Sequence, residues 1–181
     1  MVGPSQINFQ IPPGIAPGSA VGAQLTKPDG TTLLSTLNIT ATAPGIFTVL
    51  QNGQGQAAAL NQDNSKNGNP QSIVGANAAA RGSVIQIYAT GGGETTPSLL
   101  PGEAASVSGA AAGNLVLTNV QPTVSIGGQQ AAVQFSGMAP GYVGLWQINA
   151  QIPQSVTPGN AVPLVVASGD AGSNTVTVAI Q

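Results

Sequence analysis

Short runs of apolar, often β-branched residues alternate with polar residues along most of the chain. Gly, Pro or Asn interrupts these runs about every ten residues, and no stretch shows the apolar period of a helix. This pattern predicts β-strands separated by turns. In the C-terminal part of the chain it predicts six strands, at residues 84–88, 123–126, 131–135, 145–150, 162–166 and 175–180.

Gly127 and Gly128 stand between two of these strands, and two glycines accept the positive φ angles of a tight hairpin turn. A second glycine-containing segment, residues 91–113, is expected to be a long loop. With these connections, residues 82–181 have the length and strand number of a complete immunoglobulin-like β-sandwich. The predicted fold class is therefore all-β.

A repeat relates the two ends of the chain. QINFQIP at residues 6–12 returns as QINAQIP at residues 147–153, and the same shift of 141 positions aligns a later Pro-Gly and a later Ala-Val pair. The second copy is preceded by a much longer stretch than the first. We therefore expect residues 1–44 to be the closing half of a module whose opening strands are not in the chain, as in a piece of a longer repeat protein.

Three strands are expected in this partial module, at residues 6–11, 20–26 and 31–42, with a turn at residues 27–30 where Pro presets φ and Gly completes the reversal. Three strands bury too little apolar surface to be stable alone. We expect the half-module to pack on the complete sandwich or to pair with another copy of the chain. Residues 45–81, rich in Asn, Gln and Gly, are expected to be a linker or a loop wrapped on the surface.

Charge is scarce: charged residues make up 4% of the chain, with three basic residues and a net charge of −2. Three cations cannot neutralise the several phosphates that nucleic-acid binding requires, and they form no polybasic segment for an anionic membrane. No apolar run has the length of a membrane span. Nucleic acid and membrane insertion are therefore not expected among the interactions of the protein.

The chain has no cysteine, which excludes disulfides and thiolate metal sites. Together with 25 Gly and 14 Pro, the low charge favours an exported protein, so we expect an extracellular or cell-surface location. Met1 is followed almost at once by sequence that belongs to the middle of a module, so it reads as an added or fragment start.

Several motifs in succession resemble a known family. They are QINFQIP at residues 6–12, APGIFT at 43–48, residues 53–63, RGS at 81–83 leading to YATG at 88–91, VSIGG at 124–128 and APGYVGLWQIN at 139–149. Together they resemble the Solibacter-type uncharacterised C-terminal domain, a module of large secreted acidobacterial proteins. The resemblance implies an extracellular IPT/TIG-like β-sandwich and neighbouring modules as partners, and it implies no catalytic residue.

The absence of histidine and cysteine excludes Ser-His-Asp and Cys-His catalysis and His-ligated zinc. A hydrolase of a sugar, ester or lactone would have to use carboxylates. The candidates are Glu94 and Glu103, which share the long loop and could face each other, and Asp63; the alternative is that they only solvate surface loops.

Asn61, Asp63 and Ser65 carry oxygen at alternate positions, as the first half of a calcium loop does. Lys66 stands where such a loop has glycine, and no closing glutamate follows, so an Asx-rich turn is the competing interpretation. The Gly91-Gly92-Gly93-Glu94 segment follows a strand, yet neither a Lys-Ser/Thr continuation nor a helical pattern comes after it. A flexible strand exit explains it better than a phosphate loop.

Trp146 and Tyr142 are the candidates for a carbohydrate-stacking surface. Burial in the core is the alternative for Trp146, whereas Tyr142, beside a Pro-Gly turn, is expected to be exposed. In the repeated strand, Gln147, Asn149 and Gln151 share one side and Ile148, Ala150 and Ile152 the other. We expect these amides to bond the backbone of loops or of a neighbouring module.

These observations favour a non-catalytic structural or adhesive module of a larger secreted protein. Its expected partners are neighbouring modules or another copy of the chain, with polysaccharide as a further candidate partner. A carboxylate-dependent hydrolase, with or without calcium, and a carbohydrate-binding module are the alternatives.

Overall fold

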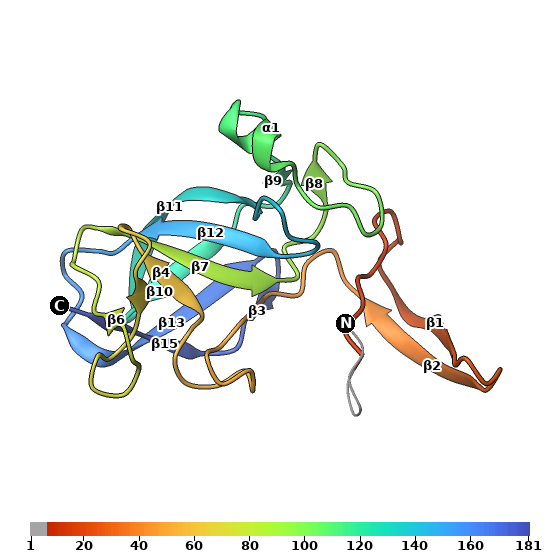
Figure 1. Cartoon of the computed structure of the whole chain (residues 1–181), viewed down its shortest axis with the longest axis horizontal. Coiled ribbons are helices and arrows are strands. Elements are labelled where there is room, and N and C mark those ends of the chain that lie inside the picture. The colour runs from red at the N-terminus through yellow and green to blue at the C-terminus, as the bar shows by residue number, and fades with distance from the viewer. Residues whose placement is uncertain (1–6) are drawn as a thin grey trace.

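The structure is a computed structural model and describes residues 7–181. It is an all-β protein, and within the described residues the one helix is the five-residue α1 (Val107–Ala111), which lies in the long loop and is capped by the Ser106 hydroxyl. Figure 1 shows a β-sandwich with α1 above it and a separate hairpin projecting from one end. The immunoglobulin-like strand order stays a prediction.

The sandwich has two layers. One contains β10 (Thr123–Ile126), β13 (Gly159–Ser168), β14 (Ala171–Gly172) and β15 (Val176–Ile180). The other contains β3 (Gly45–Ile46), β4 (Ala59–Asn61), β5 (Lys66–Asn67), β6 (Ala76–Asn77), β7 (Val84–Thr90), β8 (Thr95–Thr96), β9 (Leu117–Thr118) and β12 (Trp146–Gln151). The long strand β11 (Gln129–Met138) joins the layers, because its first residues pair with β10 and its later residues pair with β12. A bulge between Val133 and Phe135 lies within the part that pairs with β12, where it bends the strand.

Alternation places the core between the layers. Ile85 and Ile87 of β7 and Ile148 of β12 are fully buried on one side, and Leu164, Val166 and Val178 are fully buried on the other. The polar residues between them in sequence face outward, as a strand period of two requires. The six strands predicted in this half of the chain are all present, and the expected turn has φ of 59° at Gly127 and 77° at Gly128.

Residues 45–81 belong to the sandwich, which differs from the linker or wrapping loop that we expected. They supply β3–β6, and Ile46, Ala57, Ala59 and Ala79 are part of the buried core. They also cover the edge of β15: Ala57 N donates to Thr177 O at 2.8 Å and Ala79 N donates to Ala179 O at 2.9 Å. The complete domain therefore begins close to residue 42, before the boundary at 82 that the strand pattern suggested.

The N-terminal segment forms a two-stranded antiparallel sheet, β1 (Gly18–Thr26) and β2 (Thr32–Ile39). The turn at residues 27–30 is formed as expected, with Gly30 N donating to Lys27 O at 3.0 Å and φ of 84° at Gly30. The strand expected at residues 6–11 is not formed: Gln6 lies outside the described residues, and residues 8–11 form no strand.

The packing of this half-module on the sandwich, one of our two expectations, is not observed. The buried core contains no residue from positions 7–41, and most of the hairpin is exposed (Figure 1). Its contacts with the sandwich are local, such as the bond from Gly102 N to the Gln10 side chain at 2.9 Å. Pairing with another molecule stays a prediction.

Candidate functional site

The most elaborate polar surface is the outer face of β7 and β12. Gln147 lies opposite Tyr88 and Asn149 lies opposite Gln86 in the antiparallel register, and all four side chains are half-buried. Gln147 Nε2 donates to Asn149 Oδ1 at 2.9 Å. The face therefore presents a fixed row of amides rather than independent mobile side chains.

A surface hollow of about 470 Å³ lies at one end of this face. Its lining is mainly apolar and aromatic: Phe47, Ala58, Leu60, Tyr88, Ala139, Pro140, Tyr142, Leu145 and Gln147. Tyr142 is 62% exposed, as its position beside a turn predicted, and Phe47 is 45% exposed. Two exposed rings beside amide groups are the elements from which sugar-binding surfaces are built.

Tyr88 is the third ring in the lining of this hollow, and it is half-buried. Burial raises the pKa of its hydroxyl above the ordinary value of 10.0, and the nearby Tyr142 raises it further. The hydroxyl lies 3.4 Å from Gln86 Oε1, to which it donates. It therefore stays a neutral donor across the physiological pH range.

Trp146 is not part of this surface, although it was one of our two candidate binding residues. Its side chain is 1% exposed and lies on the core side of β12 together with Ile148. The indole Nε1 donates to Ser136 Oγ at 2.9 Å, so its polar atom is satisfied inside the protein. Burial, the alternative that we considered, is what the structure shows, because the strand period places residue 146 inward.

Phe47 and Tyr88 are the ring-bearing residues of the hollow that sequence reasoning did not select. Phe47 lies just after β3 and Tyr88 lies in β7, so the two residues are about forty positions apart along the chain. The APGIFT motif and the APGY motif of the sequence, which contain Phe47 and Tyr142, both contribute to the hollow. The pairing of β3 with β7 brings Phe47 beside Tyr88, and the pairing of β7 with β12 brings the segment that contains Tyr142 to the same end of the face.

Asp63 and Ser65 form an Asx turn. Asp63 Oδ1 accepts from the Ser65 hydroxyl at 2.6 Å and from Ser65 N at 3.0 Å. These two bonds, the hydroxyl first, lower the pKa of the exposed Asp63 carboxyl. Asp63 Oδ1 and the Ser65 hydroxyl are thus engaged with each other, so the geometry favours the turn that we gave as the alternative.

Asn61, the third candidate of this group, donates from Nδ2 to Ser65 Oγ at 3.0 Å, and its oxygen takes part in a buried amide network. Its Oδ1 accepts from Asn67 Nδ2 at 2.9 Å. Asn67 in turn bonds both backbone polar groups of Ala179, accepting from Ala179 N at 2.9 Å and donating to Ala179 O at 2.8 Å. Asn67 therefore pairs with β15 as a neighbouring strand would, and holds residues 61–67 against the sandwich.

Asn174 makes an equivalent connection on another edge. Its Oδ1 accepts from Ile46 N at 2.7 Å, and its Nδ2 donates to Ile46 O at 3.1 Å. Sequence reasoning treated the abundance of Asn and Gln as a sign of loops. The structure uses two of these amides as substitutes for a strand backbone, which no local pattern reveals.

Asp63 and Glu94, two of the three candidate carboxylates, lie at opposite ends of β7. Asp63 lies beside the start of β7, where Val84 N donates to the Gln62 side chain, whereas Glu94 follows the end of β7. Seven strand residues separate these ends by about 20 Å. Glu103 is exposed, and its carboxylate accepts from Leu100 N at 2.7 Å, which closes a turn of its own loop.

The glycines before Glu94 have a packing role. A Cβ on Gly92 would lie 2.8 Å from Trp146 Cδ2, so the backbone here lies directly on the indole. Gly91 has φ of 77°, and its carbonyl accepts from Ala43 N at 2.9 Å. The segment after β7 is therefore held by packing against Trp146 and by a backbone hydrogen bond, which differs from the flexible strand exit that we expected.

The repeated amide strand partly follows our expectation that its amides bond loop backbone. Gln151 Nε2 donates to Gly82 O at 3.0 Å, and in the first copy the equivalent Gln10 accepts from Gly102 N. Gln147 and Asn149 instead bond each other.

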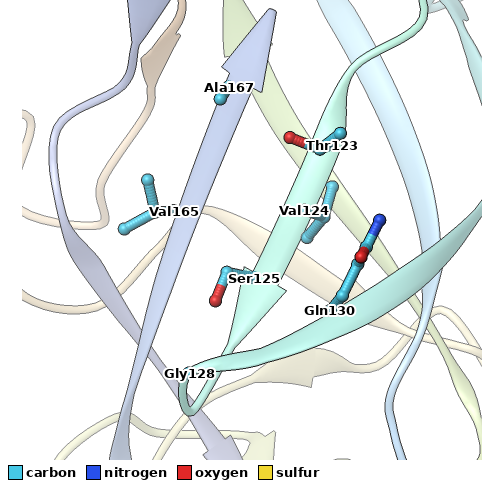
Figure 2. Close-up of a pocket in the computed structure, with 7 residues that line it drawn as sticks. All are labelled: Thr123, Val124, Ser125, Gly128, Gln130, Val165 and Ala167. Atoms are coloured by element: carbon cyan, nitrogen blue, oxygen red, sulfur yellow. The ribbon is translucent and has the colours of Figure 1, made fainter.

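A second, smaller hollow of about 300 Å³ lies on the outer face of β10 and β13 (Figure 2). Its lining consists of small or uncharged residues, Thr123, Val124, Ser125, Gly128, Gln130, Val165 and Ala167. It contains no aromatic ring and no charge, so it offers fewer groups for recognition than the first hollow.

Among residues 7–181, no three His, Cys, Asp or Glu side chains are grouped so that they could hold a metal ion. None of the helices described is long and apolar enough to cross a membrane. Comparison of the chain with protein-family models, with curated proteins and with solved structures gave no match. The resemblance drawn from the sequence motifs therefore stays a prediction.

Proposed function

We propose that this chain is a non-catalytic structural or adhesive module of a larger extracellular or cell-surface protein. The single observation that carries the proposal is the structural repeat: β1 and β2 pair in the same register as β13 and β15, shifted by 141 positions. Gly18↔Ile39, Val21↔Leu37, Gly22↔Thr36 and Ala23↔Ser35 correspond to Gly159↔Ile180, Val162↔Val178, Pro163↔Thr177 and Leu164↔Val176.

Both hairpins also have their irregularity at the same place, between the first and second of these pairs. A shared register and a shared bulge are features of a unit that is used more than once, as modules of repeat proteins are. Such units act through their contacts with neighbours. The carboxylates of the sandwich support the same proposal, because Asp63 and Glu103 accept local backbone hydrogen bonds.

The test is a screen of the purified chain against chromogenic glycosides, esters and lactones, with and without a chelator. The wild type and the Asp63→Ala, Glu94→Ala and Glu103→Ala variants should give the same background rate. A rate that follows the folded protein and falls in one of these variants, or in chelator, would favour the hydrolase instead.

The aromatic hollow favours a second function, binding of a polysaccharide. Tyr142 and Phe47 offer exposed rings, and Gln147 and Tyr88 offer hydrogen-bonding groups beside them. The hollow offers two exposed rings and few hydrogen-bonding groups, so we expect low affinity for a single sugar unit and tighter binding of longer chains.

A glycan array followed by calorimetry tests this second proposal. Tyr142→Ala should abolish binding, and the matched control Phe9→Ala should not, because Phe9 is exposed to 67% but lies in the N-terminal segment, outside the hollow. Absence of binding to every glycan, or equal loss in both variants, would refute a site in the hollow.

A further inference from the structure

The repeat shows what is missing from the N-terminal hairpin. In the second copy, β13 has two neighbours: β15 on one edge and β10 on the other, with Val165 opposite Ser125 and Ala167 opposite Thr123. Figure 2 shows β10 lying along β13 at these positions. In the first copy, β2 lies on the edge of β1 that corresponds to the β15 edge of β13. No described residue pairs with the other edge of β1, which corresponds to the β10 edge of β13.

The free backbone groups on that edge follow from the alternation of antiparallel hydrogen bonds. Lys27 N donates to Thr31 O, so Leu25 and Ala23, two and four positions earlier, also direct their backbone groups to β2. Gln24 and Thr26, between them, direct theirs away from β2. Their counterparts under the shift of 141 are Val165 and Ala167, the residues that face β10.

The apolar side chains show the same incompleteness. Ile148, Ile152 and Val156 of the second copy are at most 1% exposed. Their counterparts Ile7, Ile11 and Ile15 are 42%, 41% and 38% exposed. Leu25 is 38% exposed, whereas its counterpart Val166 is fully buried.

The counterparts of four core residues are therefore exposed in the N-terminal segment, and no residue among 7–181 pairs with the second edge of β1. Proteins normally cover exposed apolar side chains and open strand edges of this kind. Within residues 7–41 the charged residues are Lys27 and Asp29, and both lie in the turn between β1 and β2. The strand edge itself is uncharged, so an apolar strand is a fitting occupant and a charged one is not. The second copy shows what kind of strand would fit. There, β10 contributes Val124 and Ile126 to the core, and its backbone pairs with the edge of β13.

We propose that the free edge of β1 at Gln24 and Thr26 accepts an antiparallel strand of the β10 type, contributed by another sandwich module, which completes the half-module by β-augmentation. The inference deepens the proposed function and rests on it, because it assigns the partner of a structural module and the backbone groups through which the partner binds.

The probe is a fluorescein-labelled synthetic peptide with the sequence of residues 121–135, which contains β10 and the start of β11. We expect it to bind the full chain in an anisotropy titration. Hydrogen exchange read by NMR should show new protection at the Gln24 and Thr26 amides. Protection elsewhere, at β13 for instance, would mean that the peptide displaces β10 from its own sandwich and would overturn the assignment.

Gln24→Pro removes the edge N–H without removing a bond to β2, and should weaken peptide binding about tenfold or more. Gly22→Pro is the matched control, because the second copy has proline at that position, Pro163, and a Cβ on Gly22 meets no atom within 4 Å. It should bind within about twofold of the wild type. Cross-strand NMR contacts between Ala23 and Ser35 check that the hairpin is intact in both variants.

Absence of peptide binding, or equal binding by both variants, would overturn the proposal. So would a chain that dimerises without peptide, as measured by light scattering, and loses that dimer in Gln24→Pro, since the occupant would then be a second β1 edge. None of these readouts involves hydrolysis, so a failure here and a failure of the proposed function are distinguishable.

Discussion

Asn67 is the residue whose replacement tests most directly how the Asn-rich segment is held. It is 2% exposed, and its side chain takes part in four hydrogen bonds, with Ala179 N, Ala179 O, Asn61 and Gln56. In Asn67→Ala the Ala179 N–H has no remaining partner, whereas Ala179 O keeps the bond from Ala79 N. The loss of stability therefore comes mainly from one orphaned backbone donor.

An unsatisfied buried polar group costs about 1 to 3 kcal/mol, and the Asn61 oxygen loses its donor as well. We expect the free energy of unfolding to fall by about 3 kcal/mol. For a chain of this size, that lowers the melting temperature by about 6 to 12 °C. Urea denaturation and calorimetry should agree on the loss.

Asn52→Ala is the matched control, because Asn52 is exposed in the same segment and accepts one local bond, from Gln54 N at 3.0 Å. Its effect should stay below about 1 kcal/mol. Asn67→Asp adds a pH test: the carboxylate faces Ala179 O, so it should destabilise at neutral pH and recover part of the loss below about pH 4, where it is protonated. A change under about 1 kcal/mol in Asn67→Ala would refute the reasoning.

Three further outcomes are expected. Gly92→Ala should lower the free energy of unfolding by about 1 to 3 kcal/mol, measured by urea denaturation, since the added Cβ would lie 2.8 Å from the Trp146 ring; a neutral variant would contradict this packing. The lowered pKa of Asp63 gives a contribution to stability that is present above the ordinary value of 3.8 and is lost as the pH falls below it, so Asp63→Asn should have a flatter acid denaturation curve than the wild type. The raised pKa of Tyr88 gives a contribution that is present below pH 10.0 and is lost as the pH rises above it, so Tyr88→Phe should resist alkaline unfolding better; identical alkaline curves would be evidence against this.

The strands of the sandwich were predictable because alternation is a local property. The run from Val84 to Tyr88 buries every second residue, and the strand that contains Ile148 does the same. The turn at Gly127 and Gly128 was also local, since positive φ at both positions needs glycine. For these elements, neighbouring residues in the sequence contain the necessary information.

The candidate site was predicted less well. Tyr142 was identified because an exposed turn precedes it, but Trp146 was not excluded, because the side of the strand on which it lies depends on the register of β11, β12 and β7. Phe47 and Tyr88 join the hollow through pairing between β3 and β7, which a single sequence does not show.

By itself, the sequence determined that this protein is built of strands, that the segment beginning QINFQIP occurs twice, and that imidazole and thiol chemistry are excluded. Only the tertiary structure decided that residues 45–81 belong to the sandwich, that Asn67 and Asn174 replace strand backbone, and that no residue among 7–181 pairs with the second edge of β1. The physical reason is that strand formation follows from alternation over a few residues. Satisfaction of a buried polar group instead depends on partners that, for Asn67 and Ala179, are 112 positions apart.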